Sequence, residues 1–221
     1  MNKKGIKLIY KKILLLTITI LFIFGCSSKD LEKEYNKPAT YWYNKMLKNI
    51  SESRLEKADD ILTSLQSEHR NSPLLPSALM IIADAHMQEE EYELANYYYD
   101  TYIKRYENKS LQSYVRYLKI KSKFMAFKQH FREQKLIDDT LLEINTFLYN
   151  YPESPYIQLV KTMQTRLYMS KANLNVEIAD LYKRKDKPKA YEFYMQKAKK
   201  SWSNTKIIEP VSVPWYRALF E

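Results

Sequence analysis

The feature that most constrains this chain is a missing residue type, because glycine does not occur after position 25. The 221 residues contain two glycines, Gly5 and Gly25. Loops that cradle phosphates, dinucleotide fingerprints and the nucleophile elbow of hydrolases all need glycine, for a positive φ angle or for close approach of the backbone. Tight β-hairpin turns also lose their preferred residue. The sequence therefore favours helices joined by short turns of Asn, Ser and Pro.

The first 26 residues have the pattern of a bacterial lipoprotein signal. Five lysines precede an apolar run of 12 residues, Ile13 to Phe24, which is too short for the ~20 residues of a spanning helix. Gly25-Cys26 then resembles a lipobox, in which the cysteine is lipidated and the peptide is cut before it. The alternatives are a plain secretory signal or an uncleaved anchor. We expect residues 1–25 to be a signal peptide and Cys26 to be the lipid attachment site.

The composition after cleavage excludes several kinds of site. Cys26 is the single cysteine, so its lipidation leaves no thiol for disulfides, thiolate zinc sites or a cysteine nucleophile. With the five signal-peptide lysines removed, 31 of the 36 basic residues remain against 26 acidic ones, a net charge of +5. A modest charge spread along the chain is not typical of nucleic-acid binding. It fits acidic protein partners or anionic lipid headgroups better.

The remaining chain separates into three segments. Residues 26–37 are polar and aperiodic and form a lipidated tether, which reaches at most ~40 Å when extended. Residues 38–208 show helical periodicity throughout, with six periodic segments up to Leu148. A long segment follows from Tyr156 to Arg184, with an expected interruption near Asn173, and a last one from Pro188 to Trp202. Residues 209–221 are broken by proline and rich in aromatic residues.

An internal repeat indicates that these helices form pairs. Small residues recur at equivalent positions of the four pairs: Ala58, Ala95, Thr140 and Ala190. In the second pair Leu79, Ile82, Ala83 and His86 precede Ala95 at the spacings of the tetratricopeptide pattern, with His86 as a core residue. The alternative is a generic helical bundle. We expect an all-α fold, a tetratricopeptide-like array of about four helix pairs forming a curved solenoid with a concave groove.

The order of these features resembles the BamD family of outer-membrane lipoproteins. The resemblance rests on the lipobox, the tether, the start Pro38-Ala39-Thr40-Tyr41-Trp42-Tyr43, and the turns Asn71-Ser72-Pro73 and Tyr151-Pro152-Glu153-Ser154. The end, Pro214 to Glu221, is similar to the tails of the shorter Campylobacter-like members. The resemblance covers essentially the whole mature chain.

The resemblance implies a role in assembling β-barrel proteins at the outer membrane. The family binds BamA through its C-terminal half, where a basic residue pairs with an acidic residue of BamA. Lys200 takes that place here, with Lys197 beside it. Its N-terminal repeats help to receive unfolded β-barrel precursors, and a groove near Tyr41, Tyr43, Met80 and Met87 would suit their apolar segments. The tail residues Trp215, Tyr216 and Arg217 either cap the array or dock on a partner.

We therefore expect a non-enzymatic, lipid-anchored protein of the outer membrane that faces the periplasm and binds BamA and β-barrel precursors. No cofactor, metal, nucleic acid or small-molecule substrate is expected. One alternative is a helical-repeat scaffold that links the outer membrane to cell-wall or secretion machinery. The other is an enzyme built on carboxylate pairs such as Asp59/Asp60 or Asp138/Asp139. Neighbouring residues on a helix point about 100° apart, which argues against such pairs.

Overall fold

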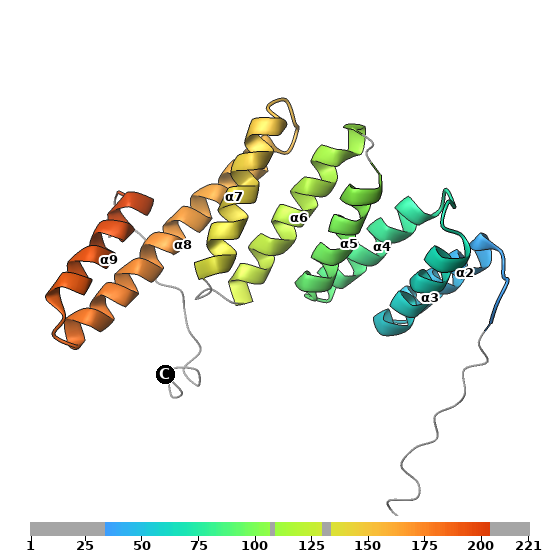
Figure 1. Cartoon of the computed structure of the whole chain (residues 1–221), viewed down its shortest axis with the longest axis horizontal. Helices are drawn as coiled ribbons and strands as arrows, with labels where there is room; N and C mark the ends of the chain where they lie inside the picture. Colours follow the sequence, from blue (N-terminus) through green and yellow to red (C-terminus); the bar gives the residue numbers. More distant parts are fainter. Residues whose placement is uncertain (1–33, 107–108, 130–133, 204–221) are drawn as a thin grey trace, which may run out of the picture. The chain divides into compact units, whose positions relative to one another are not determined.

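The computed structural model describes residues 34–106, 109–129 and 134–203, and it divides the chain into two compact units, residues 1–37 and 38–221. Over the described residues the second unit consists of eight α-helices without a strand (Figure 1). They are α2 (Ala39–Ser51), α3 (Leu55–Glu68), α4 (Leu75–Gln88), α5 (Tyr92–Arg105), α6 (Lys109–Gln129), α7 (Gln134–Asn150), α8 (Ile157–Arg184) and α9 (Pro188–Ser201). None of them combines the length and hydropathy that a membrane crossing requires.

The helices form four pairs, α2–α3, α4–α5, α6–α7 and α8–α9, and each helix packs mainly on its neighbours in the chain (Figure 1). Two buried apolar clusters meet along α6, one spanning α2 to α6 and the other spanning α6 to α8. Neither cluster includes a residue of α9. The all-α, tetratricopeptide-like fold expected from the sequence is confirmed, and the core is concentrated in the first three pairs and α8.

The predicted turns between pairs have the same local structure. The Ser72 hydroxyl accepts a hydrogen bond from the backbone N–H of Leu74 at 3.2 Å, and the Ser154 hydroxyl accepts one from that of Tyr156 at 3.3 Å. Serine side chains bond the backbone two residues on in this way and stop a helix from continuing. The two Ser-Pro sequences therefore mark the boundaries after the first and third pairs.

The turns inside three of the pairs show what the absence of glycine requires. Each turn contains one residue in the left-handed region, Ser53 (φ 53°), Glu90 (φ 63°) and Asp186 (φ 53°). Glycine is the usual residue at this place after a helix, because a Cβ atom costs roughly 1–2 kcal/mol there. Packing within each pair has to offset that cost.

The same turns establish which residues of the pairs are equivalent. In the second pair the backbone N–H of Glu91 donates to the carbonyl of His86 at 2.8 Å. In the fourth pair the N–H of Lys187 donates to the carbonyl of Tyr182 at 2.9 Å. Both bonds close a turn of the same length, so positions 96 residues apart correspond in these two pairs.

One alignment made from the sequence is therefore wrong by one residue. The expected small residue of the fourth pair was Ala190, aligned with Ala58 and Ala95. The structure places Tyr191 at that position, because Tyr191 lies four residues after the turn, as Ala95 does. Ala58 and Ala95 are fully buried between their helices, whereas Tyr191 is only half-buried. The fourth pair thus has a large ring where the others have a small side chain.

The expected interruption near Asn173 is also absent, since α8 runs unbroken from Ile157 to Arg184. The polar side chains there find partners within the helix. The Asn173 amide donates to Glu177 at 3.0 Å, and the buried Asn175 amide donates to the carbonyl of Lys171 at 2.7 Å. Polar residues that are satisfied one turn away do not end a helix.

Candidate partner-binding surface

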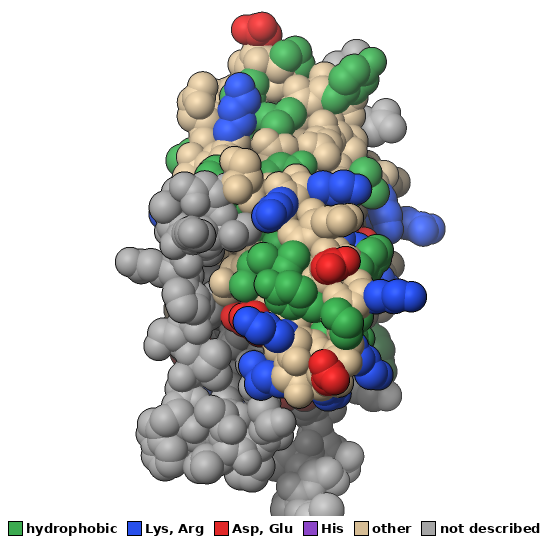
Figure 2. All heavy atoms as spheres, turned by 90° about the vertical axis from the view of Figure 1, so that its left-hand side faces the viewer, with side chains coloured by type: hydrophobic (Ala, Val, Ile, Leu, Met, Phe, Trp, Pro, Cys, Tyr) green, Lys and Arg blue, Asp and Glu red, His purple; other side chains and the backbone are tan. Residues whose placement is uncertain are grey.

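Helix α9 leaves one of its faces open among the described residues. Ala198 is its single buried residue, and Phe193 is 53% exposed. The Lys197 ammonium lies 4.9 Å from the ring centre of Phe193 and 5.4 Å from that of Tyr194, within the range of cation–π attraction. Figure 2 looks onto this end and shows hydrophobic side chains gathered in a patch bordered by Lys and Arg. Exposed apolar groups rimmed by charge are typical of a protein-binding surface.

A pocket of about 220 Å³ lies beside this face, between α7, α8 and α9. Its floor contains Ile137, Leu174 and Asn175, which are at most 8% exposed. The complete lining is Gln134, Ile137, Asp138, Lys171, Leu174, Asn175, Lys197, Lys200 and Ser201. We call it the lysine pocket. Its base is rigid because it consists of core residues, while its rim is polar.

The rim of the lysine pocket is short of negative charge. Three lysines line it, Lys171, Lys197 and Lys200, against the single carboxylate of Asp138. That carboxylate is already paired with the Lys171 ammonium at 2.6 Å. Two positive charges therefore face the pocket without a lining carboxylate to balance them. The pocket can accept an acidic side chain from outside.

The structure thus brings together the two helical residues predicted to bind a partner, since Lys197 and Lys200 line one pocket. Sequence reasoning missed Lys171 and gave Asp138 a different meaning, as half of a carboxylate pair. Asp138 and Lys171 are 33 positions apart and meet only because α7 packs on α8. The pattern of either helix alone carries no signal for this contact.

The residues expected to line a precursor groove lie on α2 and α4, which contact each other. Tyr43, Met80 and Met87 are half-buried and pack against the same core cluster. Tyr41 is 37% exposed, and its ring makes an edge contact with Trp42. Residues two positions apart on a helix point about 200° away from each other, so Tyr41 and Tyr43 lie on different sides of α2. Met80 and Met87 are seven positions apart on α4 and so share a face of that helix.

The other predicted sites lie outside the described residues. These are the lipid attachment site Cys26 and the tail residues Trp215, Tyr216 and Arg217.

His86 forms a polar junction between the first two pairs. Its ring is 1% exposed, its Nε2 lies 2.9 Å from the Asp59 carboxylate and its Nδ1 lies 2.5 Å from that of Glu91. The Tyr98 hydroxyl also donates to Asp59, at 2.6 Å. Burial, and then this hydrogen bond to Asp59, raises the pKa of Tyr98 well above its ordinary value, so the hydroxyl stays protonated. Every member of this group has a structural partner, which makes it a tie between α3, α4 and α5.

Comparisons with known proteins place the chain in a family. Residues 35–207 match the YfiO family, described as an outer membrane lipoprotein. The chain is also 38% identical to the outer membrane protein assembly factor BamD of Helicobacter pylori, over 96% of this chain and 97% of that protein. A match of this extent includes all eight described helices. The chain therefore belongs to the YfiO family of outer membrane lipoproteins, the family of BamD.

Proposed function

We propose that the protein is a non-enzymatic component of the machinery that assembles β-barrel proteins in the outer membrane. In this role it is anchored by lipid at Cys26, faces the periplasm, and binds a BamA-type protein and unfolded β-barrel precursors. The relationship to BamD supports the assembly role. The lysine pocket supports the contact with BamA, since it presents two lysine charges that no lining carboxylate balances.

The pocket fits an acidic side chain for physical reasons. Lys197 and Lys200 are exposed, so each acts as a hydrated point charge that attracts a carboxylate from a distance. Rim charges of this kind raise the association rate and set the register of a complex, while affinity comes from apolar contacts. Here Phe193 and the apolar floor, Ile137 and Leu174, supply those contacts.

Precursor binding is proposed for the α2–α4 face. Tyr43, Met80 and Met87 present partly exposed apolar surface there on top of a fully packed core. Methionine and tyrosine adapt to varied apolar partners, which suits a receptor for many different precursors.

The experiment is an affinity purification of the tagged full-length lipoprotein from detergent-solubilised outer membranes, with mass spectrometry of the proteins recovered. The wild type is compared with Lys200→Glu and Lys199→Glu. Both lysines are exposed neighbours on α9, but only Lys200 lines the pocket, so the two changes match in charge and helix position. We expect the BamA-type protein with the wild type and Lys199→Glu, and several-fold less with Lys200→Glu.

Two results would contradict the proposal. Recovery of cell-wall or secretion components without a BamA-type protein would favour a scaffold lipoprotein. Equal losses from Lys199→Glu and Lys200→Glu would show that general charge, and not the lysine pocket, determines binding.

A further inference from the structure

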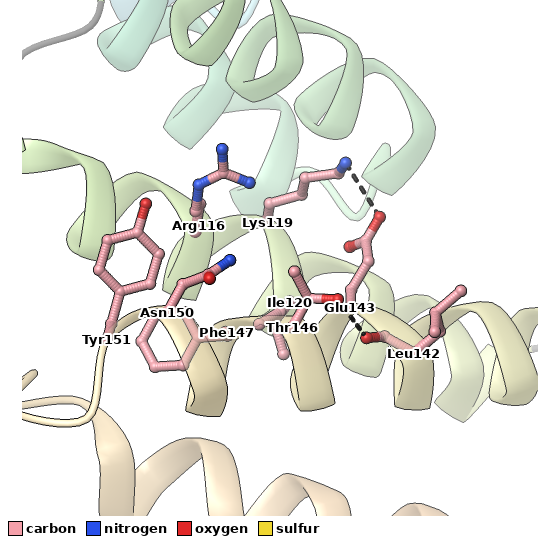
Figure 3. A pocket seen from close by; sticks show the side chains of 9 residues that line it. All are labelled: Arg116, Lys119, Ile120, Leu142, Glu143, Thr146, Phe147, Asn150 and Tyr151. Carbon is pink, nitrogen blue, oxygen red and sulfur yellow. Dashed lines mark hydrogen bonds and ion pairs between the residues drawn. The ribbon is translucent and has the colours of Figure 1, made fainter.

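A second pocket lies between α6 and α7, away from the lysine pocket. It has a volume of about 180 Å³ and a mainly apolar base in which Ile120 and Phe147 are each 2% exposed. Figure 3 shows its nine lining residues: Arg116, Lys119, Ile120, Leu142, Glu143, Thr146, Phe147, Asn150 and Tyr151. We call it the arginine pocket. Its α7 residues follow position 141, whereas those of the lysine pocket precede position 139.

The lysines around this pocket are fully matched by carboxylates. The Lys119 ammonium lies 2.7 Å from Asp100 and 3.0 Å from Glu143, and the Lys123 ammonium lies 2.7 Å from Glu143. Burial alone would lower the pKa of Lys119, but its hydrogen bonds to Asp100 and Glu143 outweigh this and raise the pKa above its ordinary value. These two lysines and two carboxylates tie α5, α6 and α7 together through Oε1 of Glu143, while its Oε2 is buried without a partner among the described residues.

Arg116 stands outside that network. It is half-buried, and its Nε atom is buried without a hydrogen-bond partner among the described residues. Its guanidinium carbon lies 6.0 Å from the ring centre of Tyr151, at the limit of cation–π attraction. In Figure 3 the dashed lines join Lys119 to Glu143 and Thr146 to Leu142, and none reaches Arg116. The pocket is therefore lined by two cations, Arg116 and Lys119, and one carboxylate, Glu143, and the charge without an ion-pair partner belongs to the planar guanidinium.

The apolar part of the pocket extends to the surface. Leu142 lines the pocket and is 67% exposed, and Tyr149, seven residues further along α7 and so on the same face, is 86% exposed. Leu142 therefore offers apolar area at the edge of the pocket, and Tyr149 continues it along α7. An unpaired guanidinium in this setting gains most from a carboxylate, which can accept two parallel hydrogen bonds from it.

We propose that the arginine pocket binds a peptide segment of a partner protein in which a carboxylate stands next to a large apolar side chain. The carboxylate pairs with Arg116, and the apolar side chain packs on Phe147 and Leu142. This contact is separate from the one at the lysine pocket, because the two pockets use different parts of α7 and share no lining residue. A single chain can therefore hold two acidic segments at once.

The test measures binding of short synthetic peptides to the purified full-length protein in detergent. Each peptide carries one Leu or Phe beside one Glu, and each is paired with the same sequence bearing Gln. The variants are Arg116→Gln, Leu142→Ala and, as a charge-matched control, Arg166→Gln at an exposed site on α8. We expect Glu peptides to bind more tightly than Gln peptides, with about a tenfold loss in Arg116→Gln, since bonds to charged groups contribute at least that much. Leu142→Ala should weaken binding several-fold, and it cannot unfold the chain because Leu142 is largely exposed.

Three outcomes would overturn the proposal. Glu and Gln peptides could bind equally, or Arg116→Gln could behave like Arg166→Gln. The third is self-association of the wild type that disappears in Arg116→Gln without any peptide binding, which would make a second copy of the chain the occupant.

Discussion

The second and fourth helix pairs share a turn and a stacked pair of rings, but they bury these features to different degrees. In α4–α5 the His86 and Tyr98 rings stack with centres 5.5 Å apart and planes at 16°, and in α8–α9 the equivalent Tyr182 and Tyr194 rings stack at 5.4 Å and 15°. His86 and Tyr98 are 1% and 8% exposed, whereas both tyrosines of the fourth pair are only half-buried.

The neighbours of each pair account for the difference. Helix α3 packs on α4 and supplies Asp59 to both His86 and Tyr98, while α6 covers α5 from the other side. Among the described residues no helix covers the far side of α9, so the same stacking remains at the surface. The same repeat pattern is therefore buried where helices cover it on both sides, and it remains partly exposed in the last described pair.

Removing the equivalent ring from each pair should give the largest difference in stability between the two pairs. We expect Tyr98→Ala to reduce the free energy of unfolding by about 4 kcal/mol, the size of a buried aromatic deletion, because the hydrogen bond to Asp59 is lost together with the packing of the ring. Tyr194→Ala should cost about 1 kcal/mol, since that ring is half-exposed. Urea unfolding followed by circular dichroism measures both. Equal losses would mean that the fourth pair is packed as tightly as the second.

Substitutions at the equivalent positions Ala95 and Tyr191 should give a smaller difference in stability. Ala95→Tyr forces a ring into a fully buried site and should destabilise the protein by about 3 kcal/mol. Tyr191→Ala, the reverse change at the equivalent place, should stay within about 1 kcal/mol. Thermal melts of the two variants, with Ala190→Tyr as the control for the alignment, would show the difference. A large loss for Tyr191→Ala would place Tyr191 in the core and contradict the equivalence.

Most of the fold was predictable because the local signals agree. Helical periodicity, the Ser-Pro turns and the buried alanines all depend on residues close together in the chain, and the structure confirms the helices they indicate. The prediction of a break near Asn173 was wrong, because the side-chain amides of Asn173 and Asn175 form hydrogen bonds within their own helix. Residue spacing alone does not show these bonds. The alignment at Ala190 failed because it followed residue identity and not the turn.

The site was less predictable because its contacts join distant parts of the chain. Lys197 and Lys200 could be named from the family resemblance, but their proximity to Lys171 and Asp138 depends on how three helices pack. Nothing in the sequence of α6 distinguishes Arg116 from its other basic residues. Only the structure shows that the nearby carboxylates of α5 and α7 pair with Lys119 and Lys123 and not with Arg116.

Hydrogen–deuterium exchange of the full-length protein, alone and with a purified BamA-type protein in detergent, tests the central claim most directly. We expect the partner to slow exchange in α9 and in the parts of α7 and α8 that line the lysine pocket, and to leave exchange in α4 and α5 unchanged. Backbone amide hydrogens near an open surface exchange when their hydrogen bonds open locally, so a docked partner should slow their exchange. Protection confined to α2–α5, or none at all, would contradict the claim that the uncovered end of the array is where the partner binds.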